Sequence, residues 1–166
     1  DFELPNQFGE KVRLSSYRGS KNVVLVFFPK SFTPTCTGEL CAIRDETGVF
    51  ENDDTVVLGI STDTTATLKV FAETEKYEFV LLSDFWPHGA VAQSYGAFFE
   101  PGGFPMRATF IIDTDGVVRW SVVNSVTPST TRDAWSTPRA KCVTGGQQPT
   151  PARGTRGAIA SPLSTA

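Results

Sequence analysis

The sequence predicts one α/β domain in which helices flank a mixed central β-sheet. Short apolar runs alternate with segments of helical periodicity, which is typical of strand–helix–strand units with parallel strands. Near the end of this pattern, the turn Asp113–Gly116 joins two further apolar runs, and an Asp-Gly turn there indicates an antiparallel hairpin. A sheet that contains both kinds of strand pair is mixed.

The N-terminal third is predicted to contain a short strand or hairpin, a buried strand and a helix. Spaced apolar residues in 1–14 predict a strand or hairpin with a turn near Gly9. A turn at Tyr17–Gly19 then precedes the apolar run Val23–Phe28, which reads as a buried strand. A helix is expected from Pro34 to about Thr47.

The middle of the chain continues the alternation. Thr55–Ser61 is predicted to form the second buried strand, and Phe79–Leu82 a third, short one. Between them, Leu68, Phe71 and Ala72 recur at helical spacing, so residues 64–77 are expected to form a helix.

A loop, a short helix and the hairpin complete the domain. Residues 83–89 are expected to form the loop, and residues 90–95 the short helix, which should stop at Gly96. The hairpin strands are predicted at Arg107–Asp113 and Val117–Val123.

The last forty residues differ in composition. We predict a domain boundary after residue 126 and a disordered tail over 127–166, because Thr, Ser, Pro, Gly and Ala dominate there and none of the thirteen phenylalanines lies in it. Five basic residues and one acidic residue give the tail a charge of +4, which leaves −7 for residues 1–126. A flexible tail is the interpretation we favour over a basic binding arm, since the charges are spread out.

Net charge, apolar content and the number of cysteines restrict the classes of function that this protein can have. The net charge of −3 gives no indication of a nucleic-acid or anionic-membrane partner, and no apolar run approaches the roughly 20 residues of a membrane span. The three cysteines, Cys36, Cys41 and Cys142, are an odd number, and the first two are too close together to staple a fold. We therefore expect reactive thiols and a reducing, cytoplasmic location.

Cys36 lies where a helix is expected to begin. Thr33 fits the N-cap position and Pro34 the first helical position, directly after a buried strand and its loop. Cys36 then falls in the first turn, where free backbone N–H groups and the helix dipole favour a negative charge. This position favours a reactive thiolate more than an average cysteine position does, and the alternative is a small buried hydrophobic residue.

The spacing of Pro29, Thr33 and Cys36 resembles the active-site motif of peroxiredoxins, and the resemblance covers residues 1–123. The run Leu82–Gly89 is similar to the alkyl hydroperoxide reductase E type, and the spacing of Cys36 and Cys41 to the bacterioferritin-comigratory type. The resemblance implies a thioredoxin-like fold and a thiol-dependent peroxidase that reduces hydrogen peroxide and organic hydroperoxides in antioxidant defence.

The resemblance also implies roles for individual residues. Cys36 would attack the peroxide and become a sulfenic acid, while the Thr33 hydroxyl would hydrogen-bond both the thiolate and the peroxide. Arg107 would supply the permanent positive charge, and Pro29 would shield the thiolate from water. Glu39 matches an acidic residue common in the family, although compensation of the helix dipole explains it nearly as well.

Cys41 is the candidate resolving cysteine. Residues five apart on an intact helix have Cα atoms about 8.6 Å apart by helix geometry, whereas a disulfide needs roughly 4.4–6.8 Å. A bond between Cys36 and Cys41 therefore requires the helix to unwind locally, as the bacterioferritin-comigratory branch does. The alternative is a buried Cys41 and an external thiol in a one-cysteine cycle, and Cys142 is a minor candidate as resolver.

Cofactor and partner expectations follow from the same residues. No prosthetic cofactor or metal is expected, because two cysteines five apart and the single histidine, His88, do not match a zinc spacing. An external reductant is required: thioredoxin, a glutaredoxin-like protein or a low-molecular-weight thiol. A homodimer is a possible assembly.

Two other functions are alternatives to a peroxidase. A thiol–disulfide oxidoreductase would need a Cys-x-x-Cys motif, which this chain lacks. A redox sensor or partner-binding protein would keep the sulfenic acid chemistry without efficient turnover.

The sequence departs from the family pattern after Val123. The family continues into a C-terminal helix that packs on the sheet, whereas this chain becomes rich in Ser, Thr, Pro and Gly. A reading-frame change near Asn124 would explain such a stretch. Without that helix we expect apolar surface to be exposed on the sheet.

Overall fold

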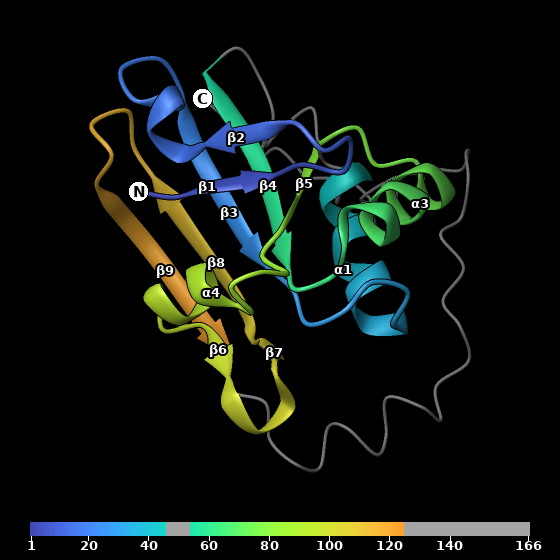
Figure 1. Cartoon of the computed structure of the whole chain (residues 1–166). Coiled ribbons are helices and arrows are strands. Elements are labelled where there is room, and N and C mark those ends of the chain that lie inside the picture. The colour runs from blue at the N-terminus through green and yellow to red at the C-terminus, as the bar shows by residue number, and fades with distance from the viewer. Residues whose placement is uncertain (46–53, 125–166) are drawn as a thin grey trace, which may run out of the picture.

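The computed structural model describes residues 1–45 and 54–124, and a five-stranded mixed sheet forms its centre (Figure 1). The strand order is β5-β4-β3-β8-β9. The strands are β3 (Asn22–Phe27), β4 (Thr55–Ser61), β5 (Val80–Ser83), β8 (Arg107–Ile112) and β9 (Val118–Asn124). β3, β4 and β5 run parallel, and β8 is antiparallel to both of its neighbours. The predicted mixed α/β architecture is confirmed.

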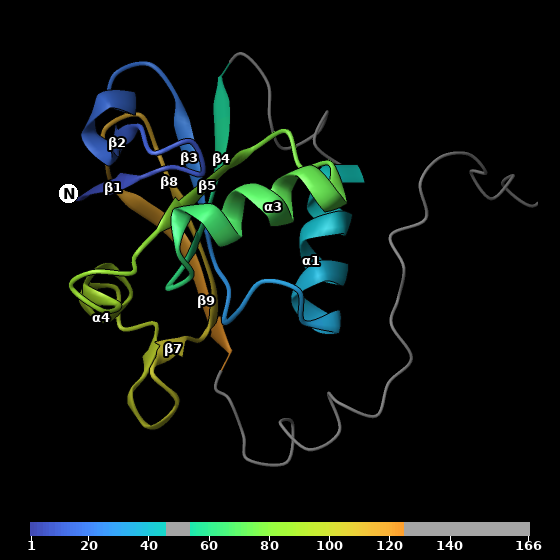
Figure 2. The same ribbon diagram turned by 45° about the vertical axis from the view of Figure 1, so that its right-hand side comes forward.

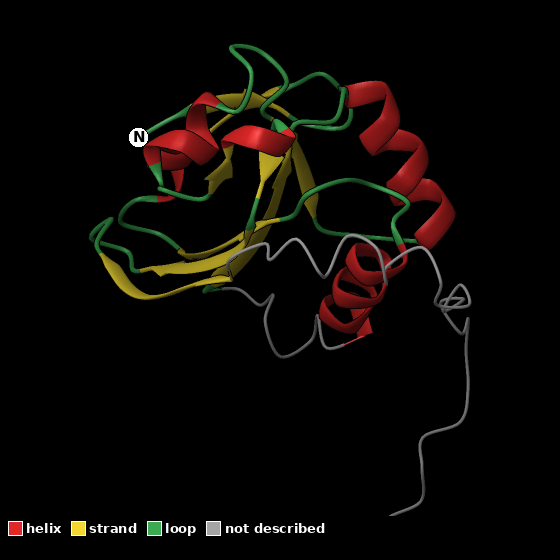
Figure 3. Ribbon diagram, turned by 90° about the horizontal axis from the view of Figure 1, so that it is seen from below, coloured by secondary structure: helices red, strands yellow, loops and turns green. Residues whose placement is uncertain are grey.

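Each face of the sheet has its own apolar core, because successive side chains of a strand point to opposite faces. Helices α1 (Pro34–Asp45) and α3 (Thr65–Glu75) cover one face and lie together to one side of the strands (Figures 2 and 3). Their core contains Val26, Phe28, Cys36, Leu40, Cys41, Val57, Leu68, Phe71, Ala72, Tyr77, Phe79 and Leu81. The N-terminal hairpin and α4 (Ala90–Ser94) pack on the other core, which includes Leu25, Phe27, Leu58, Ile60 and Phe110.

The expected N-terminal hairpin is present as β1 (Glu3–Pro5) and β2 (Lys11–Arg13), which pair antiparallel. Gly9 lies between them with a positive φ of 85°. The turn expected around Tyr17–Gly19 begins earlier than predicted, as the 3₁₀ helix η1 (Leu14–Tyr17). The sequence reasoning missed this helix because a single short turn has no repeating apolar pattern.

A second small feature was also missed. β6 (Phe98–Phe99) and β7 (Phe104–Pro105) form a two-residue antiparallel ribbon, closed by the 3₁₀ helix η2 (Glu100–Gly102). Alternation of apolar and polar residues cannot be recognised over two residues, which is why no strand is predicted here. The ribbon projects beside the end of the sheet at which β8 begins (Figure 1).

The other predicted elements agree with the structure to within about two residues at their ends, as is usual for boundary assignment. For example, the helix predicted over 64–77 is α3, whose N-cap Thr64 accepts a hydrogen bond from the Thr67 backbone N–H. Three predictions lie outside the described residues: the end of the first helix near Thr47, the domain boundary at 126 and the disordered tail over 127–166.

Buried Asp84 organises the start of α4. Its carboxylate accepts the backbone N–H groups of Val91 and Ala92 at 3.2 Å and 2.9 Å. Burial raises the pKa of Asp84, and these two hydrogen bonds act in the opposite direction. α4 is short, and neither it nor any other helix in the described ranges has the length and apolar content for a membrane crossing.

β9 is exposed along its whole length. Trp120 is 51 % exposed and lies opposite Ile111, while Val122 lies opposite Thr109, so these residues share one face of the sheet. Helices α1 and α3 cover the same face only over β3, β4 and β5. The expected exposure of apolar surface is therefore observed on the β8–β9 side of the sheet.

The two glycines that flank α4 give a matched test of packing. Gly89 and Gly96 have nearly equal positive φ values of 68° and 65°. A Cβ at Gly89 would overlap the Phe98 ring, whereas a Cβ at Gly96 would meet nothing within 4 Å. Gly96→Ala therefore isolates the left-handed backbone penalty, about 1–2 kcal/mol.

We expect Gly89→Ala to lower the free energy of unfolding by about 1–3 kcal/mol more than Gly96→Ala does, because overpacking adds to the same backbone penalty. Urea titration followed by circular dichroism measures both values. Equal losses in the two variants would mean that the Phe98 ring moves aside without strain.

Candidate active site

Helix α1 begins where the sequence predicts. The Thr33 carbonyl oxygen accepts the Thr37 backbone N–H at 2.9 Å, so Thr33 occupies the N-cap position. Its hydroxyl, however, donates to the Lys30 carbonyl oxygen at 3.1 Å. The predicted hydrogen bond from the first turn of the helix to the Thr33 hydroxyl is therefore not present. The hydroxyl instead closes the loop that precedes the helix.

Cys36 lies in the first turn of α1 with its side chain fully buried, at 0 % exposure. Among the described residues Cys36 is the free cysteine, whereas Cys41 is disulfide-bonded. The apolar core on this face of the sheet surrounds Cys36, with Leu40 one helical turn further on. Water is therefore largely excluded from its sulfur, and any charge on that sulfur depends on the few polar groups that reach it.

Arg107 reaches this sulfur from the first residue of β8. Its Nη2 lies 3.2 Å from Cys36 Sγ, and its Nε donates to Glu39 Oε2 at 3.1 Å. Glu39 is on α1, one turn after Cys36, so one guanidinium joins the strand to two residues of the helix. The planar guanidinium group carries several N–H donors in a fixed geometry, so it can contact both residues at once. The ion pair with Glu39 fixes the orientation of this group.

The charges around the sulfur are therefore one cation and one nearby anion. Arg107 places a permanent positive charge beside the Cys36 sulfur, and a hydrogen bond that involves a charged group is stronger in a buried setting. The nearby negative charge of Glu39 is paired with Arg107, and a third of the Glu39 side chain is exposed. The arrangement can hold an anionic sulfur and stabilise negative charge that moves away from it.

Asp63 holds the loop that precedes α1. Its Oδ2 accepts three hydrogen bonds: from Ser31 N at 2.8 Å, from Ser31 Oγ at 2.9 Å and from Ser61 Oγ at 2.9 Å. Ser61 ends β4, so this carboxylate ties the loop after β3 to the neighbouring strand. The sequence reasoning missed Asp63. The available signal was Ser61-Thr62-Asp63, a polar triplet directly after a buried parallel strand.

Two aromatic contacts also fix this loop. The Phe32 ring packs on Phe71 of α3 with centroids 4.8 Å apart, and Phe32 has an unusual positive φ of 61°. Lys30 Nζ lies 4.8 Å from the centroid of the Phe104 ring in the β6–β7 ribbon. Such a left-handed conformation of a non-glycine residue persists only where its surroundings enforce it. The ribbon and α3 thus help to set the loop geometry.

Not every predicted site residue is brought to the sulfur by a measured contact. Pro29 is half-buried at the start of the loop, and its shielding role stays a prediction. Cys41 is on α1 and faces α3. His88 Nε2 lies 2.7 Å from the Gly103 carbonyl oxygen, in the ribbon. Cys142 lies outside the described residues.

No candidate metal site is found in the described part of the chain. Residues 1–45 and 54–124 contain no group of three His, Cys, Asp or Glu side chains that could bind a metal ion.

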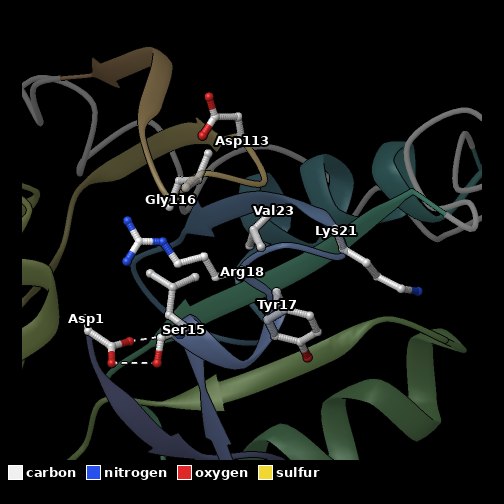
Figure 4. A pocket seen from close by; sticks show the side chains of 10 residues that line it. Asp1, Ser15, Tyr17, Arg18, Lys21, Val23, Asp113 and Gly116 are labelled. Carbon is white, nitrogen blue, oxygen red and sulfur yellow. Dashed lines mark hydrogen bonds between the residues drawn. The ribbon is translucent and has the colours of Figure 1, made fainter.

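A cleft of about 150 Å³, lined by both polar and apolar residues, lies at the end of the sheet away from Cys36 and Arg107 (Figure 4). Val23, the second residue of β3, and Ile112, which ends β8, line this cleft together with Arg18. The Arg18 Nε donates to the Asp115 carbonyl oxygen at 2.8 Å, so this cation is engaged in holding the hairpin turn. Arg107 begins β8, and Cys36 follows the C-terminal end of β3 through the loop that leads into α1, so both lie beyond the other ends of these two strands and the cleft is separate from the candidate site.

Comparison with known proteins relates the whole described region to one family. The model of the AhpC/TSA family matches residues 1–121. Alkyl hydroperoxide reductase E of Mycobacterium tuberculosis is 47% identical over 133 residues, which are 80% of this chain and 86% of that protein. Peroxiredoxin Bcp of Escherichia coli is 37% identical over 123 residues, 70% of this chain and 77% of that protein.

A solved structure gives the same relationship. Peroxidoxin BcpB from Mycobacterium tuberculosis superimposes with a TM-score of 0.67 and 35% identity, over 81% of this chain and 89% of that one.

The contact between Arg107 and Cys36 predicts a charge dependence of sulfur reactivity. Arg107→Gln removes the cation and keeps an amide donor, and we expect alkylation of Cys36 by iodoacetamide at pH 7 to slow at least about tenfold, since a hydrogen bond to a charged group contributes roughly 1.5–3 kcal/mol. Peptide mass spectrometry measures the rate at Cys36 alone.

The matched control is Arg119→Gln, because Arg119 pairs with Asp113 in the hairpin, away from the sulfur. An unchanged alkylation rate in Arg107→Gln would show that this guanidinium does not stabilise the thiolate.

Proposed function

The chain belongs to the AhpC/TSA family and is a peroxiredoxin, a thiol-dependent peroxidase, and we propose that Cys36 is the residue that attacks the hydroperoxide. The observation that carries this assignment is the Arg107 Nη2 atom 3.2 Å from the fully buried Cys36 sulfur. It supports the assignment because a nucleophilic thiolate inside an apolar core needs a permanent cation beside it.

In the proposed first step, the Cys36 thiolate attacks one oxygen of the peroxide. A sulfur–oxygen bond forms and the oxygen–oxygen bond breaks, so that sulfur is oxidised to a sulfenic acid and the peroxide is reduced to an alcohol or water. The leaving oxygen takes up a proton. During this step negative charge moves from the Cys36 sulfur to the leaving oxygen. Arg107 lies beside the sulfur, where this charge starts.

The neighbouring residues have supporting roles in this proposal. Thr33 turns its hydroxyl from the Lys30 carbonyl oxygen, where it now donates, toward the peroxide oxygen. Glu39 orients Arg107 through their 3.1 Å ion pair. Pro29, half-buried at the start of the loop, limits the access of water. Each role needs only a side chain that already borders the loop or α1.

We propose Cys41 as the residue that resolves the sulfenic acid once the protein is fully reduced. α1 is helical from Pro34 to Asp45, so Cys36 and Cys41 lie on an intact helix, where residues five apart have Cα atoms about 8.6 Å apart. That distance exceeds the roughly 4.4–6.8 Å of a disulfide. The turn between them must therefore unwind before the two sulfurs can bond.

The rest of the cycle is proposed on chemical grounds. The reaction needs no prosthetic group, because the electrons come from thiols: thioredoxin, a glutaredoxin-like protein or a low-molecular-weight thiol returns Cys36 to the thiol. An exposed apolar face on β8–β9 is compatible with a homodimer. The odd number of cysteines favours the reducing environment of the cytoplasm.

Replacing the proposed nucleophile tests the assignment directly. Because serine is a far weaker nucleophile toward peroxide oxygen, we expect Cys36→Ser to consume hydrogen peroxide with dithiothreitol no faster than the buffer blank. Cys41→Ser is the matched control and should keep turnover, since a small thiol can reduce the sulfenic acid itself. Full activity in Cys36→Ser would refute the assignment, and insulin reduction at a comparable rate would favour a thiol–disulfide oxidoreductase.

The fate of the sulfenic acid is tested on reduced protein. After one equivalent of hydrogen peroxide, we expect the loss of two hydrogens and a Cys36–Cys41 cross-link in the peptide map. A sulfenic-acid trap attached to Cys36, with Cys41 still reduced, would instead establish a one-cysteine cycle that depends on an external thiol. Intact and peptide mass spectrometry distinguish the two products.

A further inference from the structure

We propose that Tyr77 and Gly38 set the rate at which the turn of α1 between Cys36 and Cys41, here called the hinge, unwinds in the fully reduced protein: Tyr77 holds the hinge closed, and Gly38 weakens it. The inference rests on the proposed function, in which Cys36 is oxidised and Cys41 resolves it. It assigns a positioning role to Tyr77 and Gly38, neither of which touches the peroxide.

One face of α1 is fastened to the end of α3. The Tyr77 hydroxyl donates a long hydrogen bond to the Thr37 carbonyl oxygen, at 3.4 Å, and lies 3.7 Å from Cys41 Sγ. Arg44 Nη1 donates to the Glu75 carbonyl oxygen at 2.6 Å. Thr37, Cys41 and Arg44 are spaced by four and three residues, so they form one stripe along the helix.

The Tyr77 ring cannot easily move away from this stripe. It stacks on Phe79 and meets the edge of Phe71, with centroids 5.1 Å apart in both cases. Its backbone N–H donates to the Ala72 carbonyl oxygen at 2.9 Å, after the left-handed residue Lys76 closes α3. Burial, with the nearby Glu75 charge, raises the pKa of Tyr77, so the hydroxyl keeps its proton and remains a donor.

The contacts of Tyr77 lie on the segment that must unwind. In an α-helix the carbonyl of Thr37 is the acceptor for the N–H of Cys41, four residues on. Tyr77 therefore contacts both ends of that hydrogen-bonded turn, the carbonyl and the side chain. Unwinding the turn separates Thr37 from Cys41 and breaks the Tyr77 contacts with them, so these contacts resist opening.

Gly38 lies inside the same turn and acts in the opposite direction. A Cβ added there would meet nothing within 4 Å, and its φ is not positive. Neither close packing nor backbone conformation therefore requires glycine at this position. What glycine does contribute is a weaker helix, because it loses more conformational freedom on folding than alanine does.

The step that the hinge controls is the formation of the disulfide. The Cys41 sulfur attacks the Cys36 sulfur, a sulfur–sulfur bond forms and the sulfur–oxygen bond of the sulfenic acid breaks. The departing hydroxide and the Cys41 proton leave as water, so the step needs no other reactant. While the hinge is closed, the sulfenic acid persists and further peroxide can oxidise it to sulfinic acid.

Rapid-quench kinetics on fully reduced protein with one equivalent of hydrogen peroxide separates two phases, oxidation of Cys36 and formation of the Cys36–Cys41 disulfide. We expect Tyr77→Phe to speed the second phase about two- to tenfold, because it removes one hydroxyl and keeps the ring. Gly38→Ala should slow it about two- to fivefold by strengthening the helix. The first phase should be unchanged in both variants.

Tyr95→Phe is the matched control, since Tyr95 is a partly buried tyrosine in the core on the other face of the sheet. Its second phase should equal that of the wild type. A further readout is the peroxide concentration that gives half-maximal sulfinic acid on Cys36, which should rise in Tyr77→Phe and fall in Gly38→Ala. Thermal unfolding of both variants is measured alongside, so that an effect on the turn between Cys36 and Cys41 is separated from a change in global stability.

The possible failures are distinguishable. Absence of the first phase in the wild type would contradict the proposed function itself. A normal first phase without a Cys36–Cys41 disulfide, or with second phases unchanged in both variants, would overturn the hinge alone. If Tyr77→Phe does not fold, as judged by thermal unfolding, Gly38→Ala still decides: an unchanged or faster second phase overturns the inference.

Discussion

The antiparallel pairing of β3 with β8 is the constraint on which the candidate site depends. Phe27 lies opposite Ala108 in this register, so Arg107 lies beside the point where the chain leaves β3 for the loop and α1. The side chains that meet there, Cys36 and Arg107, are 71 residues apart in sequence. A shift of one residue would turn Arg107 to the opposite face of the sheet, away from α1.

Helix α1 must satisfy two opposed requirements. One side of α1, which carries Cys36 and Leu40, is buried in the apolar core. This burial stabilises the helix and keeps water from the Cys36 sulfur. The proposed chemistry nevertheless requires the same segment to unwind after oxidation. The helix combines strong tertiary contacts with Gly38, an interior residue of low helix propensity. Because the two effects oppose each other, a small change in the free energy of either one alters how often the helix opens.

Sequence patterns predicted the sheet well because its strands are long apolar runs; for β4 the predicted bounds, Thr55–Ser61, equal the observed ones. They failed for the β6–β7 ribbon, where two residues cannot show a period. The resemblance supplied Cys36 and Arg107, which the structure brings together. It could not supply Asp63 or Tyr77, because the contacts by which they act on the loop and on α1, with Ser31 and with Thr37, reach residues more than thirty positions away in the sequence.

The complete burial of the Cys36 sulfur has a consequence for the order in which two substrates act. A small oxidant needs only a narrow path to the sulfur, whereas a protein reductant must bring its own cysteine into bonding distance. With α1 closed, the second kind of encounter is sterically blocked. In the proposed cycle, a protein reductant therefore reaches the Cys36 sulfur only after α1 has opened. Sequential access, rather than selective affinity, would separate the two half-reactions.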